Sequence, residues 1–138
     1  MHKISPALLS AWTPRLLSVL RIVSAFLLLQ HGSTKLLGVP HIAFFDNLQV
    51  FSLFGIAGII ELVGGTLLLI GWFTRPVAFV LSGELAAVYF IGHAPQGAFF
   101  SPMLNQGESA VLFCFIFLYL AVAGGGEWSV DAARKTGS

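Results

Sequence analysis

Charged residues and cysteine are both scarce in this sequence of 138 residues. Lys and Arg number 7 and Asp and Glu 6, so 9% of the chain is charged, against about 25% in a typical soluble domain. The net charge of +1 provides no basic surface, and we expect no nucleic-acid partner. The single cysteine, Cys114, excludes an intrachain disulfide and a CxxC redox pair. We interpret it as a small buried hydrophobe.

Hydrophobic residues, by contrast, make up 57% of the chain, and its mean hydropathy is +0.89. A soluble chain of this length cannot bury so much apolar surface in one core, so we expect membrane lipid around it. Four apolar blocks approach the roughly 20 residues that a helix needs to cross hydrocarbon, and an unpaired backbone cannot lie in lipid. We therefore predict an all-α fold, an integral membrane four-helix bundle, with one domain over residues 1–138. Its spans are expected at about residues 14–37, 51–73, 75–92 and 107–123.

Proline and glycine mark the expected helix ends. Pro14 and Pro76 are typical of helix starts, where a missing N–H costs nothing. Gly38 and the glycines at 124–126 are typical of helix ends, because glycine adopts left-handed backbone geometry easily. The last segment, residues 127–138, is expected to be a polar tail.

The cations are distributed unevenly between the two sides of the predicted bundle. One side holds five of them, whereas the other side holds Lys35 alone. The excess of Lys and Arg marks the cytoplasmic side of a membrane protein, so we predict a multi-pass protein of a bacterial inner membrane with both termini cytoplasmic. The five cations on the predicted cytoplasmic side are Lys3, Arg15, Arg75, Arg134 and Lys135.

Ionisable residues also lie inside the predicted spans. At 100° per residue, His31 lies about 80° and Lys35 about 40° from Arg21 around the first helix, so all three share one strip. A charge in hydrocarbon costs at least about 2.5 kcal/mol. We therefore expect this strip to face the other helices.

Each remaining span carries one glutamate: Glu61, Glu84 and Glu108. Counting residues from the span ends predicts an inner polar layer of Arg21, Glu61 and Glu84. It also predicts ion pairs of Arg21 with Glu61 or Glu84, and of Lys35 with Glu108. A second, outer polar layer would contain Gln30, His31, Lys35, His93, Asn105 and Glu108.

Most of these side chains also have a purely structural interpretation. Arg21 can form an ion pair that only holds the bundle together, and Lys35 can extend to the lipid headgroups. His31 or His93 can be an ordinary interfacial histidine. Glu61 is harder to dismiss, because it lies in mid-span with glycines along its face. Small residues let helices approach closely, and an ionisable residue in such an interior is a functional candidate.

The chemistry of these groups suggests a quinone site. Carboxyl and imidazole groups can pass protons, and Arg, Lys and His donors can hold the oxygens of a quinone headgroup. No HxxxH or HxxE spacing occurs on one helix, so we expect neither a metal nor haem. Our catalytic candidates are Glu61, Glu84, His93 and Glu108, and our substrate-binding candidates are Arg21, His31, Lys35 and Asn105.

Several segments together resemble the DoxX family of small bacterial membrane proteins. They are "LRIVSAFLLLQHGSTKLLG", "IIELVGGTLLLIGWFTRPVA", the "HAPQG" loop and "GGGEWSVD". The resemblance implies a four-helix membrane bundle in which the polar residues above recur. It also implies a link to terminal oxidases, to thiosulfate:quinone oxidoreductase and to membrane oxidoreductase complexes that resist oxidative stress.

Three functional hypotheses are consistent with these observations. The leading one is a membrane oxidoreductase component that interacts with quinone and receives electrons from a redox-protein partner. The second is a non-enzymatic subunit that docks or stabilises a larger redox complex. The third is a small-solute or proton-coupled transporter, for which a homodimer could supply the pathway. Whether the chain catalyses a step by itself stays open among the three.

Overall fold

The computed structural model describes residues 3–137, and the two ends of the predicted 1–138 domain lie outside this range. The described residues form helices and contain no β-strand, which confirms the all-α class. Three helical segments are long and apolar enough to cross a membrane: Pro6–Leu37, Leu53–Ile70 and Thr74–Gln96. The elements are α1 (Pro6–Leu37), η1 (Ala43–Phe45), α2 (Leu53–Ile70), α3 (Thr74–Val88), η2 (Tyr89–His93), η3 (Ala94–Gln96), α4 (Glu108–Ala123) and α5 (Val130–Thr136).

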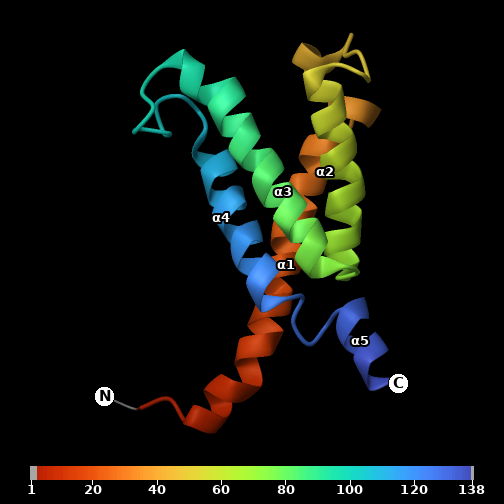
Figure 1. Cartoon of the computed structure of the whole chain (residues 1–138), viewed down its shortest axis with the longest axis vertical. Coiled ribbons are helices and arrows are strands. Elements are labelled where there is room, and N and C mark those ends of the chain that lie inside the picture. Colours follow the sequence, from red (N-terminus) through yellow and green to blue (C-terminus); the bar gives the residue numbers. More distant parts are fainter. Residues whose placement is uncertain (1–2, 138) are drawn as a thin grey trace.

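The helices pack as two pairs, α1 with α2 and α3 with α4 (Figure 1). We call the end that holds both termini the inner end and the opposite end the outer end. The two pairs touch toward the inner end and diverge toward the outer end (Figure 1). Within the first pair, a Cβ at Gly32 would lie only 2.6 Å from the backbone nitrogen of Leu62. Glycine therefore permits α1 and α2 to approach this closely.

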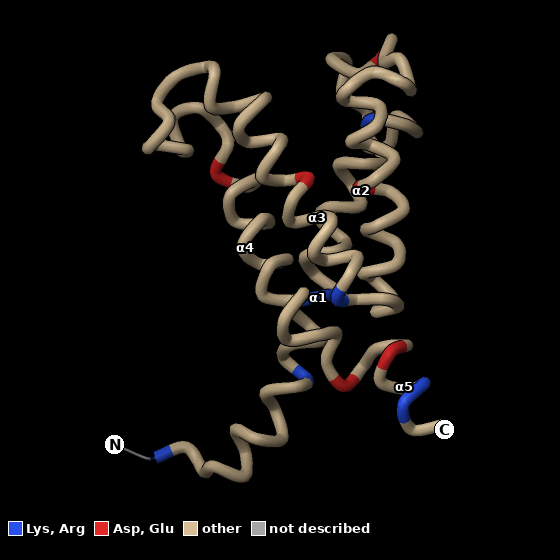
Figure 2. Tube along the Cα trace, viewed as in Figure 1, with Lys and Arg blue, Asp and Glu red and all other residues tan. Residues whose placement is uncertain are grey.

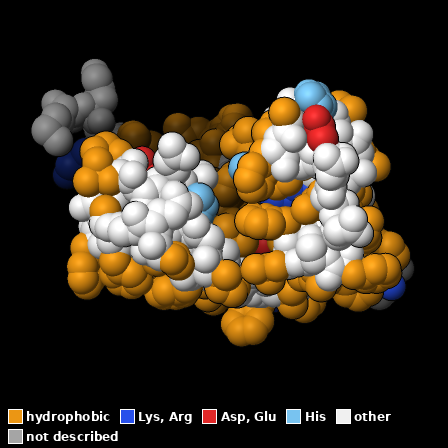
Figure 3. All heavy atoms as spheres, turned by 90° about the horizontal axis from the view of Figure 1, so that it is seen from above, with side chains coloured by type: hydrophobic (Ala, Val, Ile, Leu, Met, Phe, Trp, Pro, Cys, Tyr) orange, Lys and Arg blue, Asp and Glu red, His pale blue; other side chains and the backbone are white. Residues whose placement is uncertain are grey.

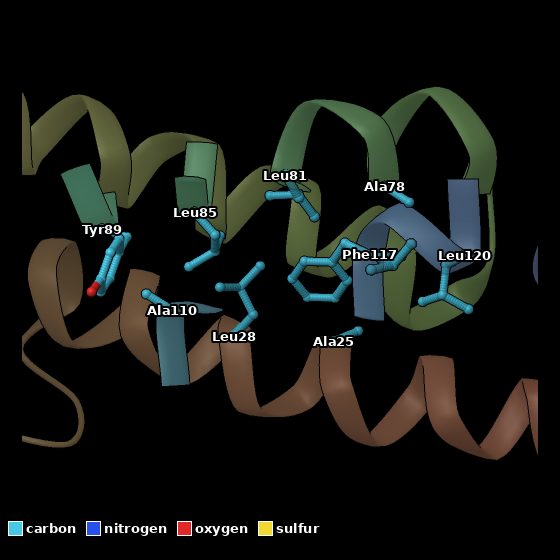
Figure 4. Packing of buried hydrophobic residues seen from close by; sticks show 10 residues of the cluster. Ala25, Leu28, Ala78, Leu81, Leu85, Tyr89, Ala110, Phe117 and Leu120 are labelled. Carbon is cyan, nitrogen blue, oxygen red and sulfur yellow. The ribbon is translucent and has the colours of Figure 1, made fainter. Parts of the chain in front are cut away.

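The buried core joins the two pairs. Figure 4 shows Leu28 of α1 and Phe117 of α4 pointing toward each other, with Leu81 and Leu85 of α3 beside them. Leu28, Phe117 and Leu81 have no exposed surface. Many large hydrophobic side chains on the outside of the helices are exposed. A surface of this kind is suited to contact with lipid rather than with water.

The first helix is longer than predicted. It begins at Pro6, which occupies the first helical turn, and it contains Pro14 in its interior. The prediction that Pro14 starts the helix is therefore wrong, because one missing N–H inside a long helix is tolerated when its neighbours favour helix. At 1.5 Å per residue the helix is about 48 Å long, so its first turns project beyond the bundle (Figure 1). Gly38 ends the helix in left-handed geometry with φ of 66°, as predicted.

Two further boundaries differ from the sequence prediction. The third span does not stop at residue 92, because a π-helical turn over Tyr89–His93 and a 3-10 turn continue it to Gln96. The expected polar tail contains the short helix α5, whose cap residue Ser129 accepts a hydrogen bond from the Ala132 N–H over 3.1 Å. The tight turn between α2 and α3 and the bounds of α4 agree with the prediction.

The cations gather at the inner end. Figure 2 shows most Lys and Arg positions near the two chain termini. This distribution agrees with the charge asymmetry expected from the sequence, and it provides a basis for orienting the protein in a membrane.

Candidate functional site

A buried ion pair connects α1 and α2. Lys35 Nζ lies 2.7 Å from Glu61 Oε1 and 2.6 Å from Oε2, and the two side chains are 9% and 3% exposed. A Cβ at Gly58 would lie 3.0 Å from Lys35 Cβ, so the absence of a side chain there lets the lysine stem run along α2. The predicted pair of Lys35 with Glu108 is wrong, because the flexible lysine extends inward to Glu61.

Glu84 of α3 lies close enough to this pair to experience the charges of both Glu61 and Lys35. Both carboxyl oxygens of Glu84 are buried and have no hydrogen-bond partner among residues 3–137. A buried polar group without a partner costs about 1–3 kcal/mol. One ammonium also balances only one of the two carboxylates. Glu84 therefore requires a proton or a donor from a bound molecule.

Glu84 and Lys35 line a cavity of about 500 Å³. Its other walls are apolar side chains and glycine from α2, α3 and η2, and its volume falls in the range of about 300–1,000 Å³ that is typical of small-molecule sites. Figure 3, which looks down on the outer end, shows a hollow between two masses of atoms, with basic and acidic side chains at its floor. The lining residues from α2, α3 and η2 are Leu53, Phe54, Ile56, Ala57, Ile60, Val80, Ala87, Val88, Ile91 and Gly92.

An apolar groove of about 390 Å³ continues from this cavity between α2 and α3. The two spaces share Ile60 and Val80 as wall residues. The groove extends to Leu67 and Pro76 near the inner end. Cavity and groove thus lie next to each other between α2 and α3, and the charged groups belong to the outer of the two.

Arg21 lies at the inner end and bonds to the backbone. Its Nη1 donates to the carbonyl oxygen of Gly125, and its Nη2 donates to that of Trp128 over 2.7 Å. The predicted pairing of Arg21 with Glu61 or Glu84 is wrong. Arg21 packs beside Gly71 at the end of α2, and Glu61 is about 15 Å further along that helix.

Two more residues join Arg21 in what we call the inner latch: Ser18, Arg21, Asp131 and the segment 124–129. Ser18 Oγ accepts a hydrogen bond from the Trp128 N–H over 2.9 Å. Asp131 accepts from the N–H groups of Phe73 and Thr74 over 2.9 Å each and thereby caps α3. The latch therefore ties the C-terminal segment to α1 and to the start of α3.

The electrostatics of Asp131 are set by these contacts. Partial burial raises the pKa of this carboxyl, but the hydrogen bonds from Thr74 and Phe73 and the charge of Arg21 outweigh burial. The net effect is a pKa below the ordinary aspartate value. The ionised carboxylate therefore stabilises the latch.

His93 and Asn105 belong to the loop at the outer end. His93 Nδ1 lies 3.0 Å from the carbonyl oxygen of Asn105. The amide nitrogen of Asn105 donates to the Tyr89 hydroxyl and to the Gly97 carbonyl, both over 3.2 Å, and its oxygen accepts from the Gly107 N–H over 3.0 Å. The Asn105 side chain is thus fully used in folding this loop.

His31 and Glu108 lie outside the cavity lining. The His31 ring contacts Phe113 of α4 edge-on at 6.1 Å, and Glu108 is exposed in the first turn of α4. Of the eight candidate residues, the structure brings Lys35, Glu61 and Glu84 together. It places the other five elsewhere. Within residues 3–137, no group of three His, Cys, Asp or Glu side chains is arranged to hold a metal ion.

Sequence reasoning missed Ser18 and Asp131. Both are polar residues whose partners are backbone groups, so no pattern of opposite charges points to them. The one available signal was the position of Asp131 seven residues after the start of the glycine run at 124–126, where a chain that folds back can cap a neighbouring helix.

Apolar membrane-length helices, exposed hydrophobic surfaces and an internal ionisable cavity define a multi-pass α-helical membrane protein. The DoxX family model matches residues 16–94, which include the whole Lys35–Glu61–Glu84 cluster. The chain belongs to the DoxX family. A Haemophilus influenzae protein described as "Uncharacterized protein" is 41% identical over 125 residues, which cover 89% of this chain and 93% of that protein. No solved structure matches the chain.

Proposed function

We propose that the chain is a membrane oxidoreductase component that binds a quinone in the cavity lined by Lys35 and Glu84, beside the ion pair of Lys35 with Glu61. The buried carboxyl of Glu84, without a partner among the described residues and next to an ammonium group, carries this proposal. Natural proteins seldom leave such a group unless it has a role.

The cavity has features that suit a quinone. The Lys35 ammonium can donate to a ring oxygen, and the Glu84 carboxyl can donate when protonated or accept when ionised. The apolar groove beyond Ile60 and Val80 provides space for an isoprenoid tail. A polar head site joined to an apolar channel favours an amphiphile over a water-soluble substrate.

A bound quinone would supply the redox chemistry, with electrons from a redox-protein partner. Lys35 would hold and orient a quinone ring oxygen through its ammonium N–H. Glu61 fixes the position of Lys35 through the ion pair. Glu84 gives or receives one proton at its carboxyl oxygen. The apolar walls exclude water from these groups.

The cation-rich inner end supports an orientation. By the positive-inside rule it faces the cytoplasm of a bacterial cell, which places both termini there and the cavity toward the outer half of the inner membrane.

The test is equilibrium binding of a short-tail ubiquinone analogue to the detergent-purified chain. Glu84→Leu removes the buried carboxyl, so we expect quinone affinity to fall at least about tenfold, the loss of one good hydrogen bond to a charged group. The same variant should raise the free energy of unfolding by about 1–3 kcal/mol, since a buried unpartnered group is removed. Glu108→Gln is the matched control, because this exposed carboxyl has no role in the proposal. Unchanged affinity in Glu84→Leu would contradict the proposal.

One observation favours the second candidate, a non-enzymatic subunit that stabilises a redox complex. The contacts of Arg21, His93 and Asn105 hold the loops at the two ends of the bundle, which is a structural role. If the chain is such a subunit, a partner protein should co-purify with it in a fixed ratio. That partner should keep its activity when the chain carries Glu84→Leu. A redox partner, a homodimer and a transport role remain predictions.

A further inference from the structure

A second, polar cavity of about 670 Å³ lies at the inner end. The turn between α2 and α3, the inner latch and α5 enclose it. The cations Arg75, Arg134 and Lys135 line it, together with the aromatic residues Trp72 and Phe73. This inner cavity shares Pro76 with the apolar groove but no wall residue with the outer cavity of Lys35 and Glu84, and its ligand is independent of the proposed function.

The charge in this cavity is unbalanced. Asp131 is the acidic residue in its wall, and each of its carboxyl oxygens already accepts a backbone N–H. Arg75 donates one nitrogen to the Val122 carbonyl at the end of α4. Arg134 is exposed and has no hydrogen-bond partner in the part of the chain that the structure describes. The cavity therefore presents guanidinium donors that an anion can use.

Thr74 belongs to the wall of this cavity but not to its donors. Its side chain has no exposed surface, and its hydroxyl lies beside the Asp131 carboxylate and helps to lower the pKa of that carboxyl. The groups that can reach a ligand are therefore the two exposed arginines of the wall, Arg75 and Arg134.

The aromatic residues place the cavity at the membrane surface. Trp72 and Phe73 stack with ring centroids 5.1 Å apart and are exposed at the end of α2. Tryptophan gathers at the level of the lipid headgroups. Arginine binds phosphate through paired, charge-assisted hydrogen bonds, and basic pockets between helices at this level bind lipid headgroups.

We propose that the inner cavity binds a phosphate group through Arg75 and Arg134. The position at the membrane surface favours the headgroup of an anionic phospholipid as the source of this phosphate. Binding there would stabilise the junction of α2, α3 and α5.

The test measures the thermal unfolding of the full chain in detergent with three additives: short-chain phosphatidylglycerol, short-chain phosphatidylcholine and inorganic phosphate. We expect phosphatidylglycerol to raise Tm and phosphatidylcholine to have little effect. Arg134→Gln should weaken phosphatidylglycerol binding about fivefold, the contribution of one cation near the membrane surface. Arg15→Gln is the matched control, because Arg15 lies at the same end but outside the cavity and pairs with Glu127.

The three additives distinguish the two sources of the phosphate group, a phospholipid headgroup and a soluble anion. A response to inorganic phosphate equal to that of phosphatidylglycerol, again lost in Arg134→Gln, supports the phosphate site but assigns it to a soluble anion. Equal weakening in Arg134→Gln and Arg15→Gln, or equal responses to the two lipids, would overturn the proposal and indicate general surface attraction.

Discussion

The inner latch and the outer cavity use buried polar residues in opposite ways. In the latch, Arg21 and Ser18 bond to backbone groups of a loop that folds back on α1. At the cavity, Lys35 and Glu84 line the wall and Glu61 pairs with Lys35 beside it, while the carboxyl of Glu84 has no hydrogen-bond partner within residues 3–137. Burial of charge therefore does not by itself mark a functional site. An unused bonding capacity next to open space is the better sign.

The connections between helices explain the difference. A three-residue turn joins α2 to α3 at the inner end and holds the two helix pairs together there. The outer ends are joined only within each pair, by the longer segments 38–52 and 97–107. The pairs can therefore diverge at the outer end (Figure 1), where Lys35 and Glu84 line the cavity of about 500 Å³.

The largest expected loss of stability comes from a substitution in the cavity wall, Lys35→Met. Lys35→Met leaves Glu61 without its cation, and breaking a buried ion pair typically costs about 3–5 kcal/mol. Chemical denaturation in detergent should show this loss of unfolding free energy. Adding Glu61→Gln to Lys35→Met should restore part of the stability, because the uncompensated charge is removed. Equal stability of the single and double variants would contradict the ion pair.

A second substitution breaks the latch instead. Arg21→Met removes two hydrogen bonds from a guanidinium to backbone carbonyls, which should lower the free energy of unfolding by about 3 kcal/mol. Quinone affinity per folded molecule should stay unchanged, since Arg21 is remote from the cavity. Arg15→Met, which breaks an exposed pair, should cost less than about 1 kcal/mol. A loss of affinity in Arg21→Met would erase the distinction between the two regions.

The smallest expected change in the free energy of unfolding comes from a substitution of Asp131. Because its folded pKa lies below the ordinary value, ionised Asp131 adds stability at neutral pH, and this stability is lost as the pH falls below about 4. Asp131→Asn should therefore cost about 1 kcal/mol at pH 7, as for a lost helix cap. The difference from wild type should shrink in acid. Unfolding curves measured from neutral to acidic pH check this, and a difference that grows in acid would contradict the assigned contacts.

The sequence was sufficient for the fold class and for much of the topology. Hydropathy located the four apolar helices, although α4 is shorter than the three segments that are long enough to cross a membrane. Glycine located the ends of α1 and α4. The ion pairs were predicted wrongly for two reasons. Lysine extends several ångströms from its own level and so reaches Glu61, and the partners of Arg21 are backbone carbonyls that no charge pattern reveals.

The candidate site was predictable only in part. Glu61 and Glu84 stood out because each is an ionisable residue in an apolar helix. Glu84 lines the cavity, and Glu61 borders it through its ion pair with Lys35. Asn105 and His93 stood out equally, yet their side chains bond within the outer loop. Glu61 and Glu84 differ from Asn105 and His93 because they lie where the two helix pairs diverge and leave open space. That divergence depends on packing between helices distant in sequence.

The most direct test is infrared difference spectroscopy of the purified chain on addition of a short-tail quinone. We predict a change in the carboxyl stretching region that is present in the wild type and in Glu108→Gln and absent in Glu84→Gln. A carboxyl signal that persists in Glu84→Gln, or a quinone that binds without one in the wild type, would contradict the assignment of the outer cavity as the functional site.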